Sequence, residues 1–172
     1  MESNFKASLL ALLKSEGGND DDKDDHGGRT SRGVTQREYN AWRIEKGLAP
    51  RDVWTASSDE IEEIYHSEYW LPWCPLMPVG LDYLYFEMAV NAGPPRATIL
   101  LQRALGVVDD GRIGPITRQT IVNYPNKVEL VNKYSEIKTA FYKSLHQPKY
   151  LRGWLNRVSA VKLTALAMLK AA

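Results

Sequence analysis

Glu16 is the residue of this sequence whose type and position most clearly suggest chemistry. Residues 3–16 read as an amphipathic helix, and eleven steps of about 100° bring Glu16 back to within about 20° of Phe5, near the middle of the apolar face. Burial and the negative end of the helix dipole would both raise the pKa of this carboxyl group. A carboxyl group still protonated near neutral pH is what a general acid for glycoside cleavage needs. The alternative is that Glu16 faces solvent beside Gly17 and Gly18.

Asp25 is the candidate for the second group that glycoside hydrolysis needs, a carboxylate that acts on the sugar or positions water. It follows Glu16 by nine residues, and a hairpin folding back over the helix end would bring the two close. Thr35, or alternatively Thr30, could hold the attacking water with its hydroxyl group. Asp25 also ends an acidic run that begins at Asp20, and most such runs are solvated loops, so this second reading stays open.

Several short motifs follow one another along the chain. From the N-terminus on they are Glu16-Gly17-Gly18, Asp25-His26-Gly27-Gly28-Arg29-Thr30, Gly33-Val34-Thr35, Tyr69-Trp70, Ala89-Val90-Asn91-Ala92-Gly93 and Gly153-Trp154-Leu155-Asn156-Arg157-Val158. In this order the sequence resembles the glycoside hydrolase family 108 lysozymes, which commonly read E-G-G, D-x-G-G-x-T, G-[IV]-T, Y-W, A-V-N-x-G and G-W-x-x-R. The resemblance covers nearly the whole chain and is far more specific than a lone Glu-Gly-Gly.

The resemblance implies an N-acetylmuramidase, which hydrolyses the β-1,4 bond between N-acetylmuramic acid and N-acetylglucosamine in peptidoglycan strands. It gives Glu16 the role of acid, which the helical pattern suggests independently. Many relatives are bacteriophage endolysins, which lyse bacterial cells, and the size of this chain without a recognisable signal peptide suits that role. We therefore expect a protein made in the cytoplasm of the host that acts in the periplasm or cell wall.

Aromatic and amide side chains supply the candidates for a sugar groove, because aromatic faces stack on sugar rings and amides bond to N-acetyl groups. With Thr30, these candidates are Tyr39, Tyr65, Tyr69, Trp70 and Asn91. Aromatic residues at helical spacing are also typical of a protein core. Asn91 stands at the end of a buried helix, where a polar side chain needs a partner. The family often has Asp two residues before Ala89, and here Glu87 stands there, longer by one methylene group.

The C-terminal half carries a second pattern. Residues 101–106 (Leu-Gln-Arg-Ala-Leu-Gly) and 110–117 (Asp-Gly-Arg-Ile-Gly-Pro-Ile-Thr) resemble a peptidoglycan-binding domain of the type found beside this catalytic region. The glycines allow a tight turn and Pro115 starts a helix, so the segment could equally serve only to buttress the catalytic helices. We expect a catalytic region over residues 1–83 and a helical peptidoglycan-binding-like region over residues 84–172, packed against it.

Apolar spacing and helix-start signals predict a mainly α-helical, lysozyme-like fold with at most one small β-hairpin near the acidic loop. Capping boxes at residues 35–38 and 57–60 each predict the start of a helix, and Pro72 ends the second one. Residues 80–92 are apolar nearly all round, which indicates burial at the centre of the fold. Further helices are predicted over residues 97–105, 117–123, 127–145 and about 151–169.

Composition and motif spacing exclude several classes of protein. The chain has 172 residues, 44% of them apolar and 25% charged, with a net charge of +1, so no overall field favours nucleic acid as a partner. The one cysteine, Cys74, allows no internal disulfide, and no run approaches the ~20 apolar residues that span a bilayer. The acidic run fits a calcium loop in neither register and the histidines stand apart, so we expect no metal, no other cofactor and a monomer.

Basic residues interrupt the apolar stripe of the last predicted helix, which is therefore amphipathic and not a membrane span. They are Arg152, Arg157, Lys162 and Lys170. These side chains could contact an anionic outer-membrane surface, and a solvated helix face is the other explanation.

Two other functions fit the same motifs. A lytic transglycosylase uses one Glu and leaves an anhydro-sugar, and a non-catalytic peptidoglycan-binding protein would keep the fold without the chemistry. Product analysis separates the first from a muramidase, and the intact Glu16-Gly17-Gly18 argues against the second. A chitinase-like specificity is a more distant alternative.

Overall fold

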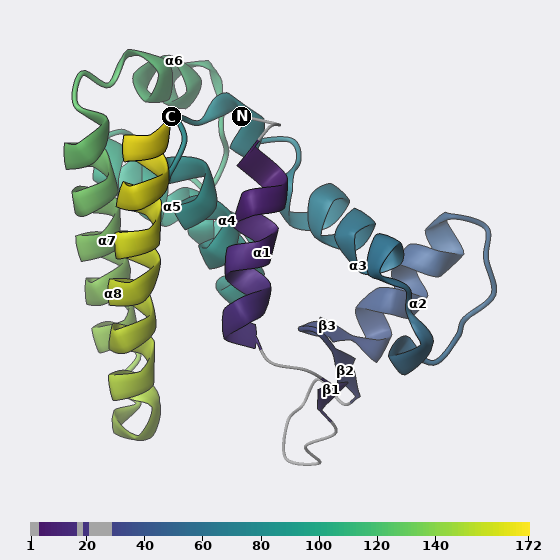
Figure 1. The fold of residues 1–172 in the computed structure, drawn as a ribbon. Helices are drawn as coiled ribbons and strands as arrows, with labels where there is room; N and C mark the ends of the chain where they lie inside the picture. The colour runs from purple at the N-terminus through teal and green to yellow at the C-terminus, as the bar shows by residue number, and fades with distance from the viewer. Residues whose placement is uncertain (1–3, 17–18, 21–28) are drawn as a thin grey trace. The chain divides into compact units, whose positions relative to one another are not determined.

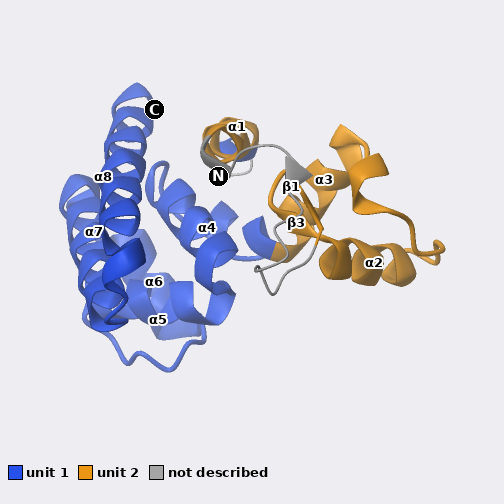
Figure 2. Ribbon diagram, turned by 90° about the horizontal axis from the view of Figure 1, so that it is seen from below, with its two compact units in different colours: residues 1–5, 69–172 blue, residues 6–68 orange. Residues whose placement is uncertain are grey.

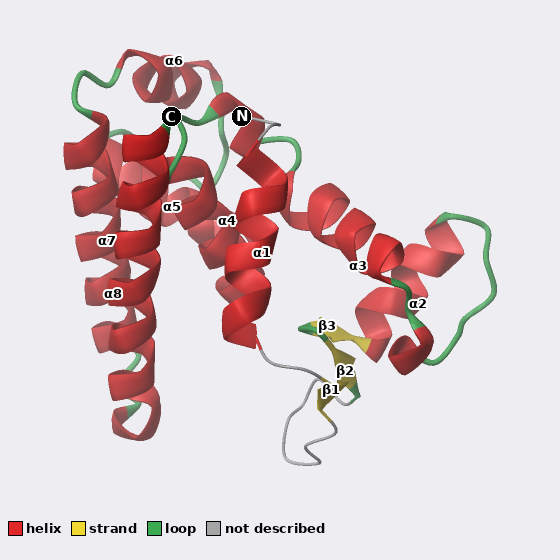
Figure 3. Ribbon diagram, viewed as in Figure 1, coloured by secondary structure: helices red, strands yellow, loops and turns green. Residues whose placement is uncertain are grey.

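The computed structural model describes residues 4–16, 19–20 and 29–172, without the side chains of residues 15, 16, 19 and 20. The chain is mainly α-helical (Figure 3), which confirms the predicted fold class. It divides into two compact units (Figure 2): residues 6–68, here the N-terminal unit, and residues 1–5 with 69–172, here the C-terminal unit. None of the described helices is long and apolar enough to cross a membrane.

The N-terminal unit holds helix α1 and a small sheet that follows it in the chain (Figure 1). Helix α1 spans Phe5–Glu16, and only its first residue belongs to the C-terminal unit. In the described part of the chain, the sheet consists of antiparallel strands in the order β1 (Asn19–Asp20), β2 (Thr30–Ser31) and β3 (Val34–Thr35). A tight turn at Arg32 and Gly33, with φ values of 50° and 83°, joins the last two strands. The predicted hairpin thus gains a third short strand.

Two helices follow the sheet, α2 (Gln36–Glu45) and α3 (Ser58–Tyr65). Both begin at the predicted capping boxes. The Thr35 side chain accepts a hydrogen bond from the backbone N of Glu38, whose side chain accepts one from the backbone N of Thr35. Ser57 and Glu60 make the same reciprocal pair at the start of α3. Each box satisfies backbone donors that a helix start would otherwise leave without partners.

The core of the N-terminal unit lies between these helices and the segment that joins them. This segment contains the 3₁₀ turn η2 (Val53–Thr55), and α3 passes into a π-helical turn, η3 (His66–Trp70). The buried side chains of this core include those of Tyr39, Trp42, Val53, Ile61, Ile64 and Tyr65. On both helices they recur at three- and four-residue intervals, so each helix turns one stripe of side chains inward.

The C-terminal unit is a helical bundle. After the 3₁₀ turn η4 (Cys74–Leu76), its helices are α4 (Leu81–Ala92), α5 (Pro94–Leu105), α6 (Pro115–Asn123), α7 (Lys127–Ser144) and α8 (Pro148–Ala171). Helix α4 packs against α5, α7 and α8, and α7 and α8 lie side by side (Figure 1). Residues 81–89 are all buried, in agreement with the apolar sequence of α4.

Three helices of this unit begin earlier than their apolar spacing predicts. Helices α5 and α8 start at Pro94 and Pro148, three residues before the predicted positions, and α6 starts at Pro115, two residues before. Proline fits the first turn because its fixed φ suits the helix and its missing N–H would have no partner there. Helix α4 runs without interruption through residues 83 and 84, and the predicted division there into a catalytic and a peptidoglycan-binding-like region stays a prediction.

A close contact fixes the start of α4 against α8. Gly80 precedes α4 with φ of 87°, and a Cβ atom there would come within 2.5 Å of the carbonyl oxygen of Ala165. The carboxylate of Asp82 accepts hydrogen bonds from the backbone N of Gly80 at 2.8 Å and from the amide of Asn4 at 2.9 Å. Only glycine fits this crossing without displacement of α8.

Candidate active site

Glu16 is the last residue of α1, as the two glycines after it predict. Its side chain and the whole of Asp25 lie outside the described residues, so the roles of both carboxyl groups stay predictions. Strand β1 begins at Asn19, three residues after Glu16, and three extended residues span at most about 11 Å. The end of α1 is therefore tied closely to the sheet.

The two candidate threonines lie opposite each other in this sheet. Thr30 on β2 pairs with Thr35 on β3 and, on its other side, with Asp20 on β1. Directly opposed residues of antiparallel strands have Cα atoms within about 5.5 Å of each other. Both hydroxyl-bearing residues therefore stand in the sheet whose first strand follows Glu16.

The Thr35 hydroxyl group has two partners, both on Glu38. It donates to Oε2 at 2.8 Å and accepts from the backbone N at 3.2 Å. Because a hydroxyl group has one proton and two lone pairs, one lone pair remains to accept a hydrogen bond from water. Thr35 also fixes where α2 leaves the sheet, and its water-holding role stays a prediction.

Tyr39 lies in the core, which does not agree with its predicted contact with sugar. Its side chain is fully buried, and its ring stacks on that of Trp42. The Tyr39 hydroxyl group donates to Glu60 Oε2 at 3.0 Å and accepts from Arg43 Nη1 at 3.3 Å and from Arg51. The aromatic stripe of α2 faces α3, so Tyr39 serves to position charges within the unit. Tyr65 is a core residue too.

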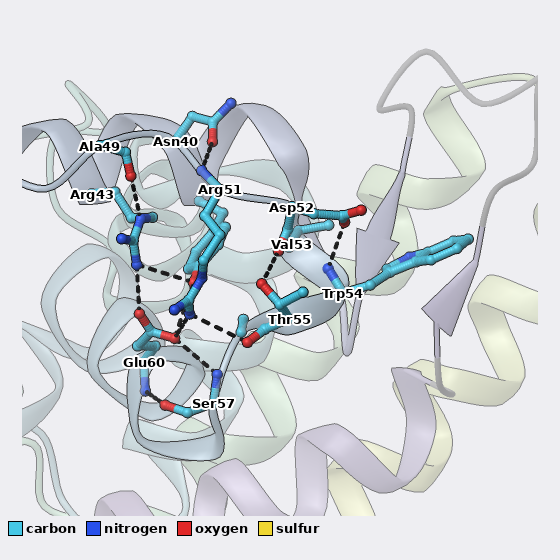
Figure 4. Close-up of polar contacts among 12 residues, drawn as sticks. Asn40, Arg43, Ala49, Arg51, Asp52, Val53, Trp54, Thr55, Ser57 and Glu60 are labelled. Carbon is cyan, nitrogen blue, oxygen red and sulfur yellow. Dashed lines mark hydrogen bonds and ion pairs between the residues drawn. The ribbon is translucent and has the colours of Figure 1, made fainter.

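Glu60 is the centre of a charged cluster that joins α2, the segment after it and α3 (Figure 4). Arg43 Nη1 lies 2.8 Å from Glu60 Oε1, and Arg51 contacts Oε2. Burial works to raise the pKa of Glu60. The hydrogen bonds from the backbone of Ser57 and the hydroxyl group of Tyr39, with the charges of both arginines, outweigh burial and hold this pKa below its ordinary value. The cluster therefore links α2, the segment after it and the start of α3.

Trp54 is the residue that the structure adds to the site, since the sequence analysis does not single it out. It stands in η2 and leaves 38% of its surface exposed. The indole Nε1 donates to the backbone oxygen of Thr30 at 2.9 Å, and the backbone N donates to Asp52 Oδ1 at 3.0 Å (Figure 4). These contacts hold an exposed aromatic ring at the central strand of the sheet. The sequence signal for this role of Trp54 is its position: it is an aromatic residue in the segment between two capped helices and lies outside the apolar stripe of either helix.

Arg29 lies over this ring. Its Cζ atom is 3.8 Å from the centre of the Trp54 ring, and its Nη1 is 2.6 Å from Asp52 Oδ2. The side chains of Arg29 and Asp52 are 42% and 39% exposed. A cation, an indole ring and a carboxylate thus form one surface patch, and Arg29 directly precedes Thr30 in the chain.

The remaining candidates belong to the C-terminal unit. Trp70 is fully buried, with its ring centre 5.3 Å from that of Phe5 and 5.5 Å from that of Phe86. It is therefore a core residue in place of the predicted sugar contact, because the helical spacing of its neighbours turns it inward. Tyr69 is partly buried, and its predicted role stays a prediction.

Asn91 finds its polar partner within α4. Its Nδ2 donates to the backbone oxygen of Glu87 at 2.8 Å and to Oε1 of the same residue at 3.0 Å. Glu87 is buried and pairs with buried Lys138 of α7 and, at 3.5 Å, with Arg157 of α8. Because a buried charge is costly without a partner, this cluster joins three helices. The predicted contact of Asn91 with an N-acetyl group stays a prediction.

The second sequence pattern forms a compact turn around Gln102. The buried amide donates to Asp110 Oδ1 at 2.8 Å and to the backbone oxygen of Arg112 at 2.9 Å, and it accepts from the backbone N of Gly111 at 2.9 Å. A pocket of about 240 Å³ lies beside this turn and includes Val108 in its lining. The pattern therefore has a structural task as well as a concave surface.

Comparisons with known proteins identify both halves of the chain. Residues 9–93 match the family model described as Glycosyl hydrolase 108, and residues 96–159 match the one described as a Predicted Peptidoglycan domain. The solved structure of SagA from Brucella abortus is similar to this chain with a TM-score of 0.85 and 28% sequence identity, over 98% of this chain and 97% of that chain. A comparison with curated protein sequences finds no match.

Proposed function

This chain belongs to glycosyl hydrolase family 108 and carries a peptidoglycan domain, and from this premise we propose that it is an N-acetylmuramidase of the endolysin type. A glycoside hydrolase region joined to a peptidoglycan domain makes it a peptidoglycan hydrolase. The bond that we propose is the β-1,4 link between N-acetylmuramic acid and N-acetylglucosamine. Its cleavage would weaken the wall and lyse the bacterial cell.

We assign the proton transfer to Glu16. Its carboxyl group would donate a proton to the glycosidic oxygen as the bond to the anomeric carbon breaks. Asp25 and a hydroxyl group of Thr30 or Thr35 would hold the water whose oxygen adds to that carbon, and Asp25 would take the proton that this water loses. The observation that carries the assignment is the place of Glu16 at the end of α1, three residues before the strand that pairs with β2.

The test digests purified peptidoglycan with the wild type and with Glu16→Gln and identifies the products by mass spectrometry. We expect reducing N-acetylmuramic acid ends from the wild type. Removal of the proton donor should lower the rate by at least about 100-fold, since a positioned acid contributes this much or more. Anhydro ends would indicate a lytic transglycosylase, and a fully active Glu16→Gln variant would refute the assignment.

Glu45→Gln is the matched control. Glu45 also ends a helix of the N-terminal unit, α2, and its side chain is exposed. The variant makes the same chemical change at the same kind of position, and we expect it to keep wild-type activity. Equal losses in both variants would mean that the Gln substitution acts through the helix end and not through catalysis.

For the route to the wall, we propose synthesis in the host cytoplasm and action in the periplasm as a monomer, with α8 in contact with an anionic outer-membrane surface. After Glu136 the sequence holds no acidic residue, whereas seven basic residues follow. On α8, Lys149, Arg152 and Lys170 are exposed. A segment whose charged residues are all basic is attracted to anionic lipid headgroups.

A further inference from the structure

We infer that the patch of Arg29, Asp52 and Trp54, here the Trp54 platform, recognises N-acetylmuramic acid. Trp54 contacts the sugar ring, and Arg29 contacts the carboxylate that this sugar carries, as the lactyl group itself or as the acidic peptide attached to it. The inference rests on the proposed muramidase function and adds to it the residues that select the substrate.

Trp54 combines exposure with rigidity. It leaves 38% of its surface exposed, although its neighbour Val53 is fully buried. Hydrogen bonds from Nε1 to Thr30 and from the backbone N to Asp52 hold it in place. A ring that is already fixed loses little conformational entropy when a ligand binds. It therefore suits the flat apolar face of a sugar.

Arg29 supplies the group that can tell the two sugars of the wall apart. N-acetylmuramic acid differs from N-acetylglucosamine by a lactyl ether that carries a carboxyl group. A guanidinium group has five N–H donors in one plane, so the contact of Nη1 with Asp52 is compatible with a second carboxylate at the other N–H groups. The Trp54 ring and Asp52 fix the orientation of this plane before substrate arrives.

The Trp54 platform lies beside strand β2, and the sheet that contains this strand begins three residues after Glu16, the proposed acid. Arg29 directly precedes Thr30, and the Trp54 indole donates to the backbone oxygen of Thr30. Thr30 pairs with Asp20 of β1, the strand that begins three residues after Glu16. A sugar on the platform would lie in the same unit as the carboxyl group that cleaves its bond.

The same contacts could instead only fasten η2 to the sheet, so the test uses changes that separate charge from packing. Arg29→Gln keeps a planar amide over the indole ring and a donor for Asp52, but it removes the positive charge. Trp54→Ala removes the ring, and Trp54→Phe keeps an aromatic face without the Nε1 donor. Thermal unfolding of each variant reports its structural cost.

Binding is measured by calorimetry in the Glu16→Gln background, which prevents cleavage. The ligands are a peptide-free peptidoglycan tetrasaccharide and the chitin tetramer, which differ by the lactyl carboxylates. We expect Arg29→Gln to weaken binding of the muramic ligand about tenfold at low salt, as a charge-assisted contact does, and to leave chitin binding unchanged. Trp54→Ala should weaken both ligands about tenfold, and Trp54→Phe should restore part of both.

Two exposed residues of the same unit serve as controls. Arg37→Gln removes an exposed cation and Leu48→Ala an exposed apolar side chain, and neither should change the binding of either ligand. The inference is overturned if Arg29→Gln weakens both ligands equally or neither, or if Trp54→Ala leaves binding unchanged. Losses that simply follow the thermal stability of the variants would also overturn it, in favour of a purely structural clamp.

Failure of the platform and failure of the proposed function give different results. A wild-type protein that releases no reducing N-acetylmuramic acid ends from peptidoglycan refutes the muramidase, whatever Arg29→Gln does. If the wild type does release such ends while Arg29→Gln keeps the preference for muramic ligands, only the platform is wrong.

Discussion

Glu60 carries its charge in a place where burial opposes it. Burial alone would raise the pKa of this carboxyl group, but hydrogen bonds from Ser57 and Tyr39 and the charges of Arg51 and Arg43 lower it further than burial raises it. A carboxyl group whose pKa is lower in the folded state stabilises the fold at pH values above its ordinary pKa of about 4.5. This contribution disappears as the pH falls through the folded-state pKa. Acid should therefore weaken the N-terminal unit.

Glu60→Gln should lower the free energy of unfolding by about 2 kcal/mol at pH 7, because it leaves Arg43 and Arg51 without a counter-charge. It should also flatten the fall in stability below about pH 4.5. Urea unfolding at pH 7 and at acidic pH measures both effects. Glu63→Gln is the control: Glu63 pairs with Lys46 at the surface, where such pairs contribute less than about 1 kcal/mol. Equal losses in the two variants would contradict the argument.

At the scale of single residues, the sequence predicts those contacts that a local pattern determines, such as helix caps. The cap of Thr35 on Glu38 spans three residues, and the structure has it as predicted. Tyr39 lies three residues before Trp42, a spacing that marks a helix face but does not say whether that face meets core or ligand. The exposure of Trp54 depends on a hydrogen bond to Thr30, 24 residues away in the sequence, and no local pattern contains it.

At the scale of helices, the crossing of α4 and α8 depends on Gly80. A Cβ atom there would meet the carbonyl oxygen of Ala165 at 2.5 Å, and φ is 87°. We expect Gly80→Ala to lower the free energy of unfolding by about 3 kcal/mol, because positive φ and the clash with a backbone atom add together. Denaturant unfolding followed by circular dichroism measures the loss.

Gly47→Ala separates the two causes. Gly47 has a similar φ of 73°, but among the described residues no atom other than those of Gly47 and its two chain neighbours lies within 4 Å of its Cβ position. Only the backbone strain remains, so the expected loss is about 1 kcal/mol. If both variants lose the same amount, α8 yields to the extra methyl group and the crossing is less tightly packed than the structure indicates.

The helices themselves were largely predictable, because caps, prolines and apolar stripes are local signals. The all-round apolar sequence of α4 predicts its burial, and residues 81–89 are buried. Which charges meet was not predictable: Glu87 pairs with Lys138, 51 residues further along the chain. That pairing follows from how α4 and α7 pack, and helix periodicity alone does not determine it.

At the scale of the whole molecule, charge is distributed unevenly although the net charge is only +1. All seven charged residues after Glu136 are basic. The attraction of such a region depends on the local density of positive charge and not on the net charge of the molecule. The reason is that charges further apart than about 10 Å are screened from each other at 0.1 M salt. Two variants of equal net charge should therefore differ in their attraction to an anionic surface if they lose cations from different parts of the molecule.

The triple variant Lys149→Gln, Arg152→Gln, Lys170→Gln tests this dependence. It changes the net charge from +1 to −2, because three of the positive charges are lost. We expect its binding to vesicles that contain anionic lipid to fall by about 100-fold at low salt, since each basic residue near such a surface contributes about 1 kcal/mol. Lys149 and Arg152 lie in the segment that matches the peptidoglycan domain, so the control for this variant is its thermal unfolding, which should not change because all three side chains are exposed.

The control triple Lys6→Gln, Arg37→Gln, Lys46→Gln removes three exposed cations from the N-terminal unit and reaches the same net charge of −2 from +1. Vesicle sedimentation compares the two triples at equal lipid and salt. Only the α8 triple should lose binding, and higher salt should abolish the difference because screening removes the attraction. If both triples lose binding equally, total charge and not α8 draws the protein to the surface. If neither binds less than the wild type, α8 has no such role and its basic residues form a solvated face.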